Sequence, residues 1–224
     1  GTRDEMSSKG WAGGFSIGSL NKIAEKWPGA FSHIVYWSIL ASERGMNYRP
    51  DFNVFPPIVR ETMPVLREAC RRAECGFGWF ARPNCIAYKA TWKQDRGVTW
   101  NPLDREHVEM ADRRFEDIVD MGATAFYMDT YGGSVGKTPL SPKGNVYYLK
   151  HLRERFGPDI MFFIEHGFDA QHVFAPIWPP GKDELGKRPF GAWSRWLVPG
   201  ATEICRVSSV QGARRAWEGG AMPI

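Results

Sequence analysis

The chain has 224 residues, of which 43% are hydrophobic and 24% charged, a composition typical of a folded globular protein rather than a disordered one. Its net charge is only +4 and its basic residues are scattered, which argues against a nucleic-acid-binding stripe. No apolar run approaches the roughly 18 residues of a transmembrane helix, so we expect no membrane span.

The four cysteines, Cys70, Cys75, Cys85 and Cys205, are too few for a disulfide-stapled scaffold at this length. Their spacing also lacks the paired short intervals of a zinc ribbon. We therefore expect buried thiols or a single disulfide, and the redox compartment stays open.

Amphipathic segments alternate with compact apolar runs along the chain. A helical period predicts helices, and runs of four to eight residues rich in aromatic and β-branched side chains predict buried strands. In chain order these are a helix over Gly18–Lys26, a strand over His33–Leu40, a helix over Ile58–Ala73, a strand over Gly76–Arg82, a helix over Asp104–Met121, a strand over Thr124–Asp129, a helix over Val146–Phe156, strands over Ile160–Glu165 and Glu203–Val207, and a helix over Val210–Gly219.

Several residues mark where these helices begin and end. Asp104 is a good N-cap, with His107 where a capping box would place Glu, and Gly122 is a good residue to follow the helix end. Gly157 and Pro158 stop the next helix in the same way. The Pro-rich stretch Pro176–Pro189 is expected to be a long loop over one strand end.

Alternation of strand and helix predicts an α/β fold with parallel strands. A doubly wound open sheet and a (β/α) barrel of TIM type both fit this order. In Thr124–Asp129 and Ile160–Glu165 one face is apolar, whereas the other turns acidic at the carboxyl end, which favours a barrel mouth. We expect one domain over residues 1–224, a partial barrel of about five βα units.

Two carboxylates end neighbouring predicted strands. Asp129 stands in YMDTYGG, and Glu165 stands in FIEHGFD. Parallel sheets bind ligands beyond the carboxyl ends of their strands. Because adjacent strands are about 4.8 Å apart, the two carboxyls fit the roughly 5–9.5 Å separation of glycosidase pairs. A capping role for Asp129 and an arginine pair for Glu165 are the structural alternatives.

Further side chains accompany this pair as candidates for holding a substrate. Arg82 ends its strand in ARPN, where a guanidinium orients a carboxylate, bonds hydroxyl groups, or forms a structural ion pair. His166 follows Glu165, with a structural histidine as the alternative. Tyr127, Tyr131 and Trp79 are candidate sugar-facing aromatics, although core packing is the better interpretation of Trp79. Among Trp178, Trp193 and Trp196, at least one is expected to line the mouth.

The segments GFGWFARPN, GATAFYMDTYGG and IMFFIEHG resemble the middle strands of TIM-barrel glycoside hydrolases of the α-galactosidase-like type. The resemblance covers about Gly76–Gly167. It implies glycosidic bond cleavage, a carbohydrate substrate, no cofactor, an extracellular or periplasmic location, and Asp129 as the nucleophile. The family's acid/base follows the sixth strand, and the corresponding EICRVSS here carries its only carboxylate, Glu203, at the start. Glu165 is then the second carboxylate.

Other functions fit parts of the sequence. Glu165, His166, Asp169 and His172 have spacings that suit a metal, so a metal-dependent barrel lyase, isomerase or hydrolase is one alternative. A non-catalytic carbohydrate-binding or structural module is another. Residues 131–138 differ from a phosphate-binding loop because Tyr131 replaces its first glycine and prolines follow, so we expect no nucleotide. An incomplete barrel would favour a homo-oligomer.

Overall fold

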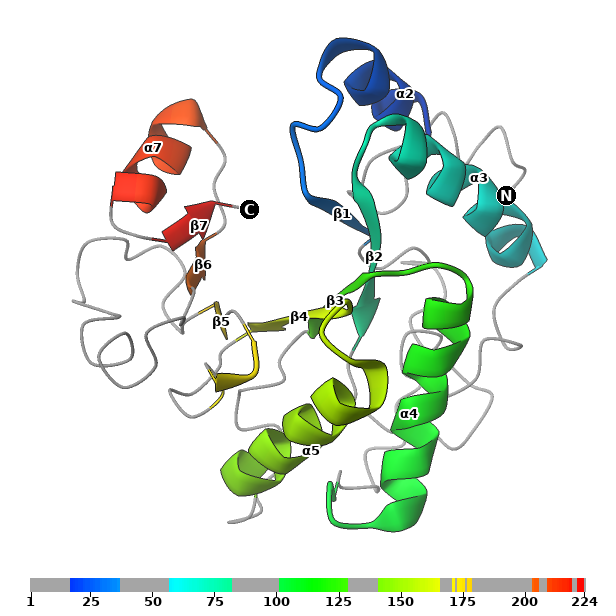
Figure 1. The fold of residues 1–224 in the computed structure, drawn as a ribbon, viewed down its shortest axis with the longest axis vertical. Coiled ribbons are helices and arrows are strands. Elements are labelled where there is room, and N and C mark those ends of the chain that lie inside the picture. Colours follow the sequence, from blue (N-terminus) through cyan, green and yellow to red (C-terminus); the bar gives the residue numbers. More distant parts are fainter. Residues whose placement is uncertain are drawn as a thin grey trace. The chain divides into compact units, whose positions relative to one another are not determined.

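A computed structural model describes residues 17–36, 57–81, 101–128, 141–165, 171, 173–175, 177–178, 203–205, 209–218 and 221–223. The chain divides into two compact units, Gly1–Tyr127 and Met128–Ile224, and each is described by itself. Figure 1 shows the helices and strands of both units. The expectation of a single domain over residues 1–224 stays a prediction.

Helices and strands alternate in the first unit. They are α2 (Ile17–Lys26), β1 (His33–Tyr36), α3 (Pro57–Arg72), β2 (Gly76–Ala81), α4 (Arg105–Asp120) and β3 (Ala125–Met128, whose last residue belongs to the second unit). The strand order is β1-β2-β3. Strands β1 and β2 pair in parallel, with His33 beside Gly76 and Tyr36 beside Trp79. Strand β3 lies next to β2, and Thr124 N donates to Phe77 O at 2.8 Å.

Aromatic and aliphatic side chains form the core of this unit. Phe115 of α4 meets Phe126 of β3 edge to face with ring centroids 4.8 Å apart. Phe77 and Trp79, two positions apart on β2, make a second edge contact at 6.0 Å. Helix α3 contributes a buried stripe at helical spacing, comprising Met63, Leu66, Ala69 and Cys70, and Ala73 directly after the helix is buried as well. In α3 and α4 the apolar positions whose period predicted the helix are therefore the positions that the helix buries.

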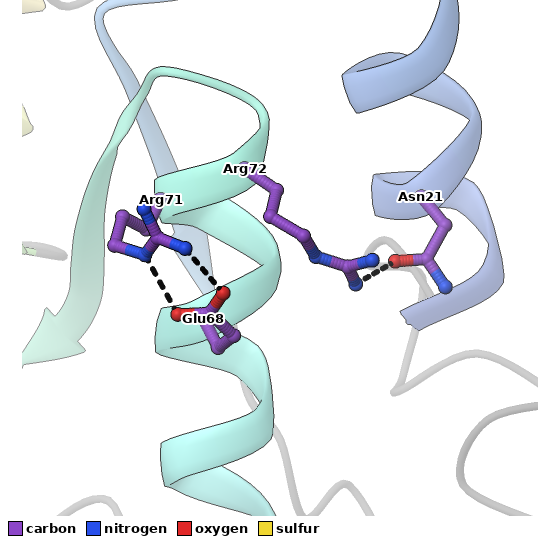
Figure 2. Close-up of polar contacts among 4 residues, drawn as sticks. All are labelled: Asn21, Glu68, Arg71 and Arg72. Atoms are coloured by element: carbon purple, nitrogen blue, oxygen red, sulfur yellow. Dashed lines mark hydrogen bonds and ion pairs between the residues drawn. The ribbon is translucent and has the colours of Figure 1, made fainter.

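A hydrogen bond links α2 to α3 at the surface, and an ion pair lies within α3 beside it. Figure 2 shows the Arg72 guanidinium donating to the Asn21 side-chain oxygen on α2. The neighbouring Arg71 makes two hydrogen bonds of 2.8 and 2.7 Å with the carboxylate of Glu68, which lies about one turn earlier in α3. This ion pair lowers the pKa of Glu68 and raises that of Arg71. Exposed pairs of this kind contribute little to stability because water screens them.

The ends of α4 confirm the capping predictions. The Asp104 side chain accepts hydrogen bonds from the backbone N–H groups of Glu106 at 2.9 Å and His107 at 3.5 Å. The His107 ring in turn accepts from Asn101 N at 3.0 Å through Nδ1. Gly122 follows the helix with φ of 96°, a left-handed conformation that glycine adopts without a Cβ clash.

The second unit contains α5 (Ser141–Phe156), β4 (Met161–Glu165), β5 (Ile177–Trp178), β6 (Glu203–Cys205), α7 (Val210–Glu218) and β7 (Ala221–Pro223). Its strands lie in the order β4-β5-β6-β7, and each pairs in parallel with the next. Helix α5 buries Tyr148, Leu149 and Leu152, and its Phe156 ring contacts Phe162 of β4. Arg153 donates to Ile160 O at 2.6 Å and so ties the end of α5 to the residue that precedes β4.

The α/β class and the parallel pairing of strands are confirmed. The strands β5 and β7 were not predicted, and the expectation of a loop throughout Pro176–Pro189 is wrong at its start, where residues 177–178 form β5. A strand of two or three residues next to a proline is too short to show a hydrophobic period. Only its pairing with a neighbouring strand therefore identifies it as a strand. Among the helices that the structure describes, none is both long and apolar enough to cross a membrane.

Candidate functional site at the carboxyl ends of the strands

The predicted site residues follow or end the observed strands. Glu165 is the last residue of β4, Asp129 directly follows β3, which ends at Met128, and Arg82 directly follows β2, which ends at Ala81. Asp129, Arg82, Tyr131 and His166 lie outside the described residues, as do Trp193 and Trp196. The roles of these residues therefore stay predictions. The ends of β2, β3 and β4 lie within one residue of the predicted strand ends.

The register between β4 and β5 brings two of the predicted residues together. In this parallel pair the Cα of Glu165 is the partner of the Cα of Trp178, and both residues end their strands. Neighbouring strands lie about 4.8 Å apart, so the carboxylate and the indole start from adjacent backbone positions. The sequence placed Trp178 in a long loop, whereas the sheet places its backbone beside that of Glu165.

Glu203 is not level with Glu165 and Trp178 in the sheet. It is the first residue of β6 and pairs with Ile177, one position before Trp178. Because successive residues of a strand point to opposite faces, the position of Glu203 alternates with that of Trp178 and Glu165. Glu203 therefore begins its strand, as the sequence indicated, whereas Glu165 ends its own.

Two aromatic candidates from the first unit are buried. Tyr127 is 5% exposed, and the other residues of β3 are buried as well, which is typical of a strand covered on both faces. Trp79 is 3% exposed, so core packing, the preferred interpretation of this residue, is confirmed. Substrate contact by Tyr127 stays a prediction.

Three buried polar side chains had not been singled out from the sequence. Asp112, Asn145 and Gln171 are each at most 5% exposed. Asn145 lies at helical spacing from Tyr148 and Leu149 in the buried stripe of α5, and Asp112 stands in the same relation to Phe115 of α4. The sequence did carry a signal for Asp112 and Asn145, because each is a polar residue within the apolar stripe of a helix. A polar group buried in such a stripe requires hydrogen-bond partners.

A second polar group lies at the amino ends of the strands in the first unit. The His33 ring and the Thr124 hydroxyl both approach Gly76, at the positions a Cβ on that glycine would contact. Burial lowers the pKa of His33, so the ring is favoured in its neutral form. This end of a parallel sheet is the one associated with stability, not with ligand binding.

No group of three or more His, Cys, Asp or Glu side chains that could hold a metal occurs in the part of the chain that the structure describes. Of the metal-site motif, His166, Asp169 and His172 lie outside that part. The metal-dependent alternative is thus neither supported nor overturned by the described geometry.

No protein-family model matches this sequence, and no curated protein matches it. Among solved structures, the chain is similar to the ligand-free alpha-N-acetylgalactosaminidase of Bifidobacterium bifidum, with a TM-score of 0.49 and 12% sequence identity. The similarity covers 99% of this chain and 52% of that one, so the chain spans about half the length of the structure it matches. A likeness of this degree assigns no activity to the chain.

Proposed function

We propose that the chain is a glycoside hydrolase of the α-galactosidase-like type whose strands form part of a (β/α) barrel. The observation that carries the proposal is the common carboxyl end of β4 and β5, where Glu165 and Trp178 are register partners. A glutamate and a tryptophan at adjacent backbone positions are residue types suited to sugars, because an indole offers an apolar face and a carboxylate exchanges a proton or bonds hydroxyl groups.

In this proposal the two strand-end carboxylates divide the chemistry between them. Asp129 attacks the anomeric carbon or stabilises its developing positive charge, and Glu165 protonates the oxygen of the leaving group. Glu165 follows the buried residues Phe163 and Ile164 at the end of β4 and is proposed as the proton donor. Arg82, Tyr127, Tyr131 and His166 are proposed to hold the sugar.

The test is hydrolysis of aryl glycosides, including α-galactosides and α-N-acetylgalactosaminides with good and poor leaving groups. Asp129→Asn preserves shape and removes the charge, and it should lower turnover of every cleaved substrate by several orders of magnitude. Glu165→Gln should slow substrates with poor leaving groups most, since those depend on protonation.

Asp159→Asn is the matched control for the first variant. Asp159 is exposed in the turn before β4, near the amino end of that strand, so its substitution should leave turnover unchanged. Retention of near-wild-type turnover by Asp129→Asn would show that the nucleophile assignment is wrong. Turnover that depends on an added divalent metal would favour the metal-dependent class. Glycan binding without any cleavage would favour the non-catalytic module.

A further inference from the structure

The turn that joins α3 to β2 places two cysteines at a defined separation. Cys75 N donates to Cys70 O at 3.0 Å, and Glu74 N donates to Arg71 O at 3.1 Å. Glu74 has φ of 54°, the left-handed conformation between these two bonds. This is the Schellman motif, in which the side chains of the first and last of six residues characteristically contact one another.

Helix α4 ends in the same motif and shows what normally occupies these two positions. There Ala123 N donates to Ile118 O at 3.1 Å, Gly122 N donates to Val119 O at 2.7 Å, and Ile118 and Ala123 are both buried. The α3 turn has Cys70 and Cys75 in place of this apolar pair. The same backbone geometry therefore places a cysteine at each of these two positions, and neither cysteine is in a disulfide.

The hydrogen bonds limit how far apart the two cysteines lie. Since Cys75 N is 3.0 Å from Cys70 O, the two Cα atoms are at most about 7 Å apart, at the upper edge of the roughly 4.4–6.8 Å that a disulfide spans. The Cys75 Sγ donates to the same carbonyl oxygen at 3.4 Å, so this sulfur already lies against the backbone of Cys70.

We propose that Cys70 and Cys75 are a redox modification site that low-molecular-weight disulfides such as oxidised glutathione convert to an intramolecular disulfide. Cys75 is partly exposed and reacts first, whereas Cys70 is only 1% exposed. The Cys75 thiolate attacks one sulfur of the small disulfide and expels a small thiolate. The Cys70 thiolate then attacks Cys75 Sγ in the mixed disulfide and expels the second small thiolate. The two protein thiols lose two electrons and two protons, and the small disulfide is reduced to two thiols.

The surroundings of Cys75 determine how fast the first step runs. Burial raises the pKa of this thiol, so little of it is thiolate at neutral pH. The rate of mixed-disulfide formation should therefore rise about tenfold per pH unit across neutral pH. The product would tie the last turn of α3 to the residue that precedes β2, a link that restricts the unfolded chain.

Tryptic mapping of the native 224-residue chain tests the proposal. The protein is incubated with oxidised glutathione at pH 8.5, the remaining thiols are alkylated, and the digest is analysed without reduction. Cleavage at Arg71 and Arg72 puts Cys70 in the peptide 68–71 and Cys75 in the peptide 73–89, which also carries Cys85. A Cys70–Cys75 disulfide joins these two peptides, whereas a Cys75–Cys85 disulfide stays within one of them.

We expect the joined peptides to appear, to vanish on reduction, and to persist in Cys85→Ser. In Cys75→Ser they should be lost. The proposal is overturned if native wild-type protein keeps both Cys70 and Cys75 alkylatable after prolonged incubation. It is also overturned if Cys75 is recovered in a disulfide with Cys85 or Cys205 instead.

Discussion

Adding a single methyl group to Gly76 tests how the three strands of the first unit fit together at their amino ends. A Cβ at this position would lie 2.4 Å from His33 Cδ2, 2.6 Å from His33 Nε2 and 2.8 Å from Thr124 Oγ1. All three distances are too short for non-bonded atoms. The clash comes from both sides, since His33 is the register partner of Gly76 on β1 and Thr124 immediately precedes β3.

Overpacking of this kind costs about 1–3 kcal/mol, and removing a strand glycine returns roughly 0.5–1 kcal/mol of backbone entropy. Gly76→Ala should therefore lower the free energy of unfolding by about 1–2 kcal/mol. Urea denaturation followed by tryptophan fluorescence measures this as a lower midpoint with an unchanged m-value.

The same substitution in a His33→Ala background separates the two contacts. His33→Ala removes both of the shortest distances and leaves the one to Thr124 Oγ1, so Gly76→Ala should cost no more than half as much there. If Gly76→Ala is neutral in the wild type, or costs the same with and without the imidazole, the packing argument is wrong.

Three further predictions concern stability. Gly122→Ala should lower the thermal unfolding midpoint more than Gly157→Ala does. Both glycines have positive φ, of 96° and 75°, so both substitutions strain the backbone, but only a Cβ on Gly122 would clash with a side chain, at 2.6 Å from Arg67. Equal losses of stability would show that this clash contributes nothing. Pro64→Ala should raise the free energy of unfolding by about 1–3 kcal/mol, because the exposed Pro64 inside α3 removes a helical hydrogen bond. Urea titration of the wild type and the variant measures this, and a lower midpoint for the variant would contradict it. Burial lowers the pKa of His33 from 6.5 in the folded state, so the unfolded chain binds the proton more readily. The contribution of His33 to the free energy of unfolding should therefore be full above pH 6.5 and decline as the pH falls below it. Urea titrations at several pH values should show a smaller decline for His33→Gln than for the wild type.

Most of the regular structure was predictable from local patterns. The helix over Arg105–Asp120 follows from an apolar period of 3.6 between Asp104 and Gly122, and both end residues act as predicted. Strands β3 and β4 are short apolar runs that are buried on both faces, which gives a local signal strong enough to find them. The candidate site stays a prediction, and of its residues the structure describes only the backbone of Glu165 at the end of β4, of Trp178 at the end of β5, and the buried Tyr127.

Sequence alone determined the class of fold, both ends of α4 and the position of Glu165 at the end of β4, since these depend on interactions between residues close in the chain. The tertiary structure alone decided that residues 177–178 form a strand, and that Trp178 is the register partner of Glu165. It also decided that Cys75 Sγ lies against the Cys70 carbonyl. These depend on hydrogen bonds and packing with partners that no local period identifies, because strand register and burial are set by the neighbouring element and not by the segment itself.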